Sequence, residues 1–163
     1  KDARIINELS NAATKMSEGE MMEIRLGKEA SITEDDYIKV LEFKTASLFE
    51  ASAKIGAITG GGDEDQVEEQ LQPGHTPGGA DGRAQALGIA YQVHDDLIDW
   101  SNENRLFNML VRKNGKPKDF VDQMDKLYQS YASKAKNELH KISTHSEAKL
   151  HLEHLTDLTS VQF

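Results

Sequence analysis

Apolar residues recur at intervals of three or four along most of this chain, which is the spacing of one face of an α-helix. The first such segment runs from about Asp2 to Leu26 and stops at Gly27, because glycine commonly terminates helices. A second segment begins after Thr33, whose hydroxyl can cap a first turn, and continues through IKVLEFKTASLFEASAKIGAI to the stop at TGGG. The pattern therefore predicts two long amphipathic helices before Gly60.

The composition then changes to glycine, proline and acids over residues 60–82. We expect a flexible loop region there, with at most a short helix over DEDQVEEQL. Helical spacing returns near Arg83 and continues to Trp100. Three further elements are expected: a short helix over RLFNMLVRK and, after a turn, helices near 118–142 and 146–160. The chain is thus predicted to be all-α.

The composition narrows the classes of protein to which this chain can belong. At 163 residues the chain is long enough for one domain with a sizeable core, so residues 1–163 are expected to form one domain or part of one. The absence of cysteine excludes disulfides and thiolate metal sites and is compatible with the expected cytoplasmic location. No apolar run has the length of a membrane span. A net charge of -9 argues against a nucleic-acid surface.

Three aspartates interrupt the apolar sequence of the third predicted helix, YQVHDDLIDW. Gln92, Asp96 and Asp99 share one helical face, and Asp95 lies four residues before Asp99. Such carboxylates repel one another unless positive charge stands opposite, and oxygen-only ligands suit Mg²⁺, which commonly bridges carboxylates to substrate phosphates. A solvated helix end is the simpler interpretation of DDLID alone, but the apolar LGIAYQV before it favours a cavity.

The second predicted helix carries Lys44 and Thr45 among largely apolar neighbours. Each residue alone has an ordinary explanation, because a lysine can extend outward to solvent and a threonine can bond the carbonyl four residues back. A lysine that reached the cavity of the aspartates would instead bind phosphate oxygens bridged by the metal. The two motifs together therefore favour a site for a phosphorylated ligand and Mg²⁺.

These motifs resemble those of a known enzyme family. FKTASLFEASAKIGAITGG followed by LGIAYQVHDDLID is similar to the C-terminal half of the trans-isoprenyl diphosphate synthases, which make farnesyl, geranylgeranyl and longer prenyl diphosphates. Their second aspartate-rich motif reads approximately F-Q-x-x-D-D-x-x-D, and Lys44 and Thr45 match their lysine-threonine pair. The resemblance implies an all-α isoprenoid-synthase-type bundle around a deep cavity. There, Mg²⁺ ions held by two facing aspartate-rich motifs bind an allylic prenyl diphosphate, and isopentenyl diphosphate attacks the allylic cation.

The resemblance also implies a role for each matched residue. Metal binding is expected of Asp95, Asp96 and Asp99. Lys44 would contact the allylic diphosphate, while Thr45 and Gln92 would line the pocket near the reacting carbons.

One further acid is expected on the substrate side of the cavity. The segment SEGEMMEIRLG has Gly19-Glu20 and then Glu23 where the family often has Gly-Gln and, three residues later, an aspartate. Glu20 is therefore a candidate substrate-binding residue, and an ordinary surface carboxylate of the helix is the alternative.

Two features depart from the family pattern. No second D-D-x-x-D motif and no arginine pair occur upstream, so we expect this chain to be inactive alone and to need a complementary N-terminal half, either on another chain or beyond this sequence. After Trp100 the family usually has a longer loop, so residues 101–117 are expected to contain a shortened or partly missing loop.

Three functions remain open from the sequence. The chain is the C-terminal part of a prenyltransferase, a non-catalytic helical subunit that pairs with and regulates an active prenyl synthase, or a helical scaffold whose acids lie on the surface. An isolated half-bundle would expose a wide apolar face. We therefore expect tight association, as a dimer or hetero-oligomer.

Overall fold

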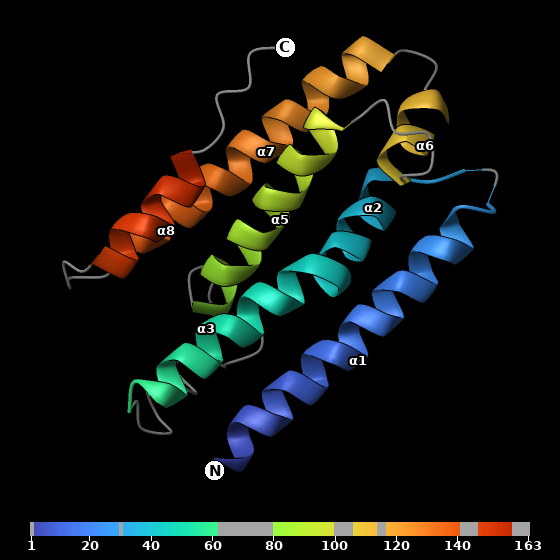
Figure 1. Ribbon diagram of the computed structural model, residues 1–163. Helices are drawn as coiled ribbons and strands as arrows, with labels where there is room; N and C mark the ends of the chain where they lie inside the picture. Colours follow the sequence, from blue (N-terminus) through green and yellow to red (C-terminus); the bar gives the residue numbers. More distant parts are fainter. Residues whose placement is uncertain are drawn as a thin grey trace.

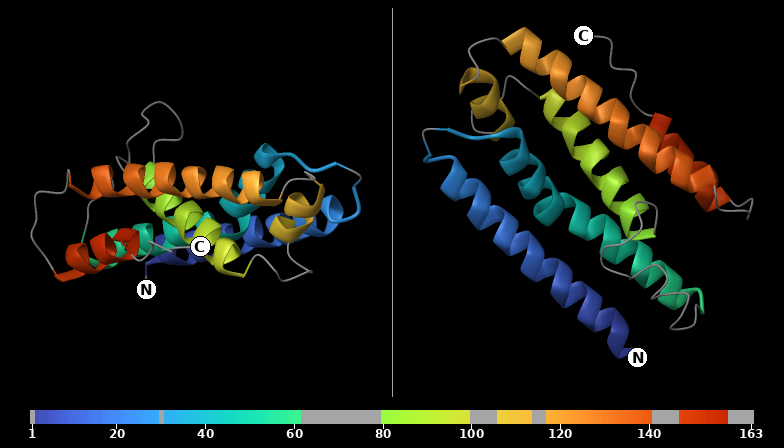
Figure 2. Two further views of the ribbon diagram at one scale, coloured as in Figure 1. Left: turned by 90° about the horizontal axis from the view of Figure 1, so that it is seen from above. Right: turned by 180° about the vertical axis from the view of Figure 1, so that it is seen from behind.

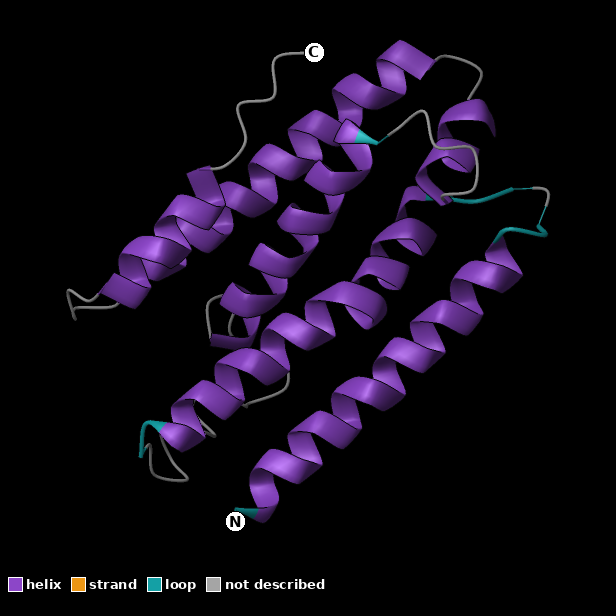
Figure 3. Cartoon of the chain, viewed as in Figure 1, coloured by secondary structure: helices purple, strands orange, loops and turns teal. Residues whose placement is uncertain are grey.

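A computed structural model describes residues 2–29, 31–61, 80–99, 106–113, 117–140 and 147–157. Every regular element within these ranges is a helix (Figure 3). The elements are α1 (Ala3–Leu26), α2 (Glu34–Leu41), η1 (Glu42–Ala46), α3 (Ser47–Thr59), α5 (Ala80–Ile98), α6 (Leu106–Lys113), α7 (Pro117–His140) and α8 (Glu147–Asp157). The all-α prediction is therefore confirmed. The expectation for DEDQVEEQL and residues 62–79 of the expected loop at 60–82 lie outside the described residues, but α5 already begins at Ala80, so the loop ends earlier than predicted. Within 101–117, residues 106–113 form the predicted short helix, and residues 101–105 and 114–116 lie outside the described residues.

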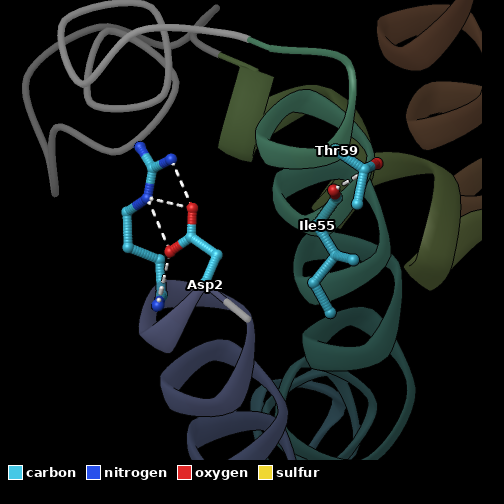
Figure 4. A network of polar contacts seen from close by, with 4 residues as sticks. Asp2, Ile55 and Thr59 are labelled. Carbon is cyan, nitrogen blue, oxygen red and sulfur yellow. Dashed lines mark hydrogen bonds and ion pairs between the residues drawn. The ribbon is translucent and has the colours of Figure 1, made fainter.

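Side-chain hydrogen bonds stabilise several helix ends, and the sequence predicted the cap at Thr33. Thr33 and Asp36 form a capping box at the start of α2, in which the Asp36 N–H donates to Thr33 Oγ1 at 3.1 Å and the Thr33 N–H donates to Asp36 Oδ2 at 3.0 Å. The Asp2 side chain caps α1 by accepting the backbone N–H two residues later. In the last turn of α3, Thr59 Oγ1 donates to the Ile55 carbonyl at 2.8 Å (Figure 4).

The second predicted helix is continuous but contains a π-helical segment, η1, between α2 and α3. A π-helical turn holds one extra residue and often occurs at functional sites. Here it carries both Lys44 and Thr45. The periodicity of the sequence predicted a single regular helix and did not reveal this segment.

Two glycines allow neighbouring helices to contact the backbone of η1. A Cβ atom on Gly19 of α1 would lie 2.9 Å from the Lys44 backbone nitrogen, and one on Gly88 of α5 would lie 2.7 Å from the Ala46 Cα. Real Cβ atoms essentially never approach so closely. The absence of a side chain at each position therefore lets α1 and α5 pack directly on η1.

The long helices lie side by side in the order α1, α2 with α3, α5 and α7, and successive neighbours run in opposite directions (Figures 1 and 2). α8 packs on α7, and α6 lies near the start of α2. The core between these helices contains Tyr37, Val40, Ile89, Val93, Leu97, Phe107, Leu110 and Met124, all nearly inaccessible to solvent. Among the described helices, none is both long and apolar enough to cross a membrane.

Candidate functional site

A pocket of about 560 Å³ opens where the C-terminal parts of α1 and α5 meet α2, η1 and α6. Apolar side chains form part of its wall, including Ile24, Val40, Leu106 and Met109. Among the described charged residues that line it are the carboxylates of Glu20, Glu23, Asp95 and Asp96 and the ammonium of Lys44. The pocket therefore combines an apolar wall with a strongly acidic polar wall.

Lys44 reaches from the π-helical segment to two carboxylates of α1. Its Nζ lies 2.7 Å from Glu20 Oε2 and 2.5 Å from Glu23 Oε2. Partial burial lowers the pKa of the Lys44 ammonium, but the hydrogen bonds to Glu20 and Glu23 outweigh this effect and hold the pKa above its usual value. Lys44 is thus firmly cationic at neutral pH. The sequence did not decide whether Glu20 faces the cavity or the solvent. In the structure Glu20 lines the pocket, and its side chain is 53% exposed.

A chain of hydrogen bonds joins Thr45 to the aspartates of α5. Thr45 Oγ1 donates to Gln92 Oε1 at 2.9 Å. The amide nitrogen of the same glutamine, Nε2, donates to Asp95 Oδ2 at 3.2 Å and to Asp96 Oδ1 at 3.1 Å. Gln92 therefore fixes the orientation of both carboxylates and ties them to η1.

Tyr37 is a site residue that the sequence reasoning missed. Its hydroxyl donates to Asp96 Oδ2 at 2.7 Å in a buried contact, and Asp96 is only 5% exposed. Both carboxylate oxygens of Asp96 therefore accept hydrogen bonds from the protein. The spacing of Tyr37, Val40 and Lys44 by three and four residues places them on one helical face, and this signal could have identified Tyr37.

The remaining predicted metal ligand, Asp99, lies apart from this arrangement. α5 ends at Ile98, and Asp99 is an exposed residue of the following turn that is not among those lining the pocket. His94 also points elsewhere, because its ring lies 5.9 Å from that of Tyr128 on α7. The structure thus brings Lys44, Thr45, Gln92, Asp95, Asp96 and Glu20 together, and leaves Asp99 outside the pocket.

The carboxylate oxygens of the pocket supply some of the ligands that a hard divalent cation needs. Across the described residues, no three His, Asp or Glu side chains converge closely enough to hold an ion by themselves. Mg²⁺, however, is usually bound through only one or two carboxylates together with waters and substrate phosphates. Asp95 and Asp96 on one wall supply that number, so the donor set fits Mg²⁺ bound jointly with a phosphorylated ligand.

Comparison with known proteins gives a consistent assignment. Residues 1–113 match the family model described as polyprenyl synthetase. Over 97 residues the chain is 39% identical to a geranylfarnesyl diphosphate synthase of Methanosarcina mazei, which covers 60% of this chain and 29% of that protein. It is 32% identical over 98 residues to the octaprenyl diphosphate synthase of Escherichia coli, which covers 60% of this chain and 27% of that protein.

Solved structures give the same result. A geranyltranstransferase from Methanosarcina mazei superposes with a TM-score of 0.72 at 27% identity and covers 95% of this chain and 52% of that one. A geranylgeranyl pyrophosphate synthetase from Geoglobus acetivorans superposes with a TM-score of 0.73 at 25% identity and covers 96% of this chain and 57% of that one. The chain therefore has the fold of about half of each of these structures.

Proposed function

Since the chain belongs to the polyprenyl synthetase family, we propose that it is the C-terminal part of a prenyltransferase that condenses an allylic prenyl diphosphate with isopentenyl diphosphate. The observation that carries this proposal is the convergence of Lys44 with Asp95 and Asp96 on one pocket from two segments distant in sequence, η1 and α5. A diphosphate needs both cations and metal ligands of this kind, because negative charge grows on it as it leaves. The named relatives that the chain matches are synthases of prenyl diphosphates.

We assign the polar residues of the pocket as follows. Asp95 is the foremost candidate ligand for Mg²⁺, which would neutralise charge on the diphosphate when bound. Asp96 is the neighbouring carboxylate, and its orientation is fixed because Tyr37 and Gln92 both donate hydrogen bonds to it. Lys44 is the cation that meets the diphosphate oxygens, and Gln92 forms pocket surface beside the reacting carbons. Thr45 does not itself line the pocket, and its hydroxyl orients Gln92. The position of Asp99 does not support a role as a ligand of this pocket.

The proposed activity needs a complementary half. The chain spans 29% of the Methanosarcina synthase and about half of the superposed structures, and a second aspartate-rich motif is absent from its sequence. We propose that the complementary half supplies the facing carboxylates, so that the two halves close around the cavity as one cytoplasmic enzyme.

A regulatory role is the second candidate function. In this role the chain would bind an active prenyl synthase without contributing to the chemistry, and it would need no facing aspartate-rich motif. The intact hydrogen-bond network around Asp95 and Asp96 favours the enzymatic role instead, because a purely structural subunit has no use for two oriented carboxylates in an open pocket.

Co-expression with the N-terminal half of a polyprenyl synthetase separates the two functions. We expect labelled isopentenyl diphosphate to be incorporated into a longer prenyl diphosphate when both halves and Mg²⁺ are present, and not by either half alone. The Asp95→Asn variant should remove this activity, whereas Asp125→Asn, which removes one charge outside the pocket, serves as the control. The regulatory role would be favoured if the complementary half were fully active by itself and if the activity of the co-expressed pair were unchanged by Asp95→Asn.

A further inference from the structure

The ion-pair arrangement at Lys44 has a consequence for how a ligand enters the pocket. An ammonium group has three N–H donors, and Glu20 and Glu23 each lie within salt-bridge distance of the Lys44 Nζ, so one donor remains for a phosphate oxygen. The two carboxylates nevertheless offset the positive charge of the ammonium, and Asp95 and Asp96, which line the same pocket, repel an approaching phosphate.

Glu20 and Glu23 differ in their surroundings. The Glu23 side chain is 25% exposed, whereas that of Glu20 is 53% exposed. Glu20 is also an acid where the family often has an amide. A glutamine there could still bond Lys44, but it would leave one fewer negative charge beside the ammonium.

We infer that Glu20 weakens metal-free anion binding, because its carboxylate holds Lys44 Nζ and offsets the charge that a diphosphate would meet there. Divalent cations at Asp95 and Asp96 would offset the negative charge of the pocket, and the diphosphate would then bind Lys44 more tightly. This inference rests on the proposed function, since it concerns how the same site admits its diphosphate. It makes Glu20 a positioning residue for Lys44.

The reactivity of Lys44 toward an amine-acylating reagent tests this contact without any ligand. Loss of the Glu20 carboxylate removes an interaction that favours the ammonium form of Lys44. In the Glu20→Gln variant the reagent should therefore acylate Lys44 faster at a given pH, and the pH dependence of the acylation rate should shift to lower pH. Peptide mass spectrometry reports the rate. Glu18→Gln is the matched control, because Glu18 is exposed on α1 and does not line the pocket. Equal pH profiles for the wild type and Glu20→Gln would overturn the inference.

Calorimetric titration with inorganic pyrophosphate, in EDTA and in Mg²⁺, gives the second test. We expect wild-type affinity to depend strongly on Mg²⁺, and Glu20→Gln to raise the metal-free affinity roughly two- to fivefold, which is the range of a partly exposed ion pair. Glu18→Gln should change neither affinity. Normal Mg²⁺-dependent binding without the metal-free gain in Glu20→Gln would overturn the inference alone. Absence of pyrophosphate binding to every variant, with Mg²⁺ present, would contradict the proposed function as well.

Discussion

At the residue scale, the pocket depends on side chains that orient other side chains. Gln92 donates to both Asp95 and Asp96, and Tyr37 donates to Asp96 from within the core. A carboxylate that is only 5% exposed needs such donors, because an ionised group without them is costly to bury. The buried Asp96 is therefore an organising residue, and the less buried Asp95 keeps access to the pocket.

Replacing Tyr37 with phenylalanine should destabilise the protein by about 1–3 kcal/mol, because the buried Asp96 carboxylate would lose a donor. Urea denaturation followed by circular dichroism measures the change. Tyr91→Phe removes the same hydroxyl from a side chain that is 48% exposed, so it should alter the free energy of unfolding by no more than about 0.5 kcal/mol. Equal effects of the two substitutions would show that the Tyr37 hydroxyl contributes nothing to stability.

At the element scale, the π-helical segment sets the position of Lys44 and Thr45. It is bounded by α2 and α3 and contacted at its backbone by α1 and α5 through Gly19 and Gly88. One added residue in the turn changes the direction in which the following side chains point. The close approach of α5 to η1 also keeps Gln92 within hydrogen-bond distance of Thr45.

Adding a methyl group at Gly88 tests this packing. Its Cβ would lie 2.7 Å from the Ala46 Cα, so α5 or η1 must shift, and we expect Gly88→Ala to lower the free energy of unfolding by about 1–3 kcal/mol. Gly56→Ala is the matched control in α3, where a Cβ would meet nothing within 4 Å. That change should stabilise the protein by about 0.5–1 kcal/mol, because alanine favours the helix. Thermal unfolding that shifted in the same direction for both variants would contradict the packing described for η1.

Most of the helices follow from local patterns, but the π-helical segment and Tyr37 do not. Thr33 marks a helix start through a capping preference that acts over a few residues, so the sequence predicts it directly. Gly27 follows the last residue of α1 as predicted, although it keeps a right-handed helical conformation. The π-helical segment η1 is packed directly against α1 and α5, which are distant in sequence, so a local pattern does not show its surroundings. Periodicity likewise placed Asp99 on the face of Gln92 and Asp96, and its N–H still donates to the Asp95 carbonyl at 3.0 Å, but Asp99 is exposed and lies beyond the residues that line the pocket.

At the scale of the whole molecule, α1 lies at one edge of the row of helices (Figure 1) and carries exposed apolar side chains. Four of its large apolar side chains are more than half exposed: Ile6 (60%), Leu9 (55%), Met21 (71%) and Ile24 (54%). Exposed apolar surface of this kind marks an interaction site. The proposed complementary half would cover it, and Ile24 connects this face to the pocket, since it also lines the cavity.

The central claim is that Asp95 and its neighbours bind a diphosphate together with Mg²⁺, and pyrophosphate titration of Asp95→Asn and Asp99→Asn in Mg²⁺ tests it most directly. Loss of a charge-assisted contact costs about 1.5–3 kcal/mol, so Asp95→Asn should weaken binding by at least about tenfold. Asp99→Asn removes the same charge four residues later but outside the pocket, and it should change the affinity by less than about threefold. Equal losses in the two variants, or binding that is indifferent to Mg²⁺, would contradict the account.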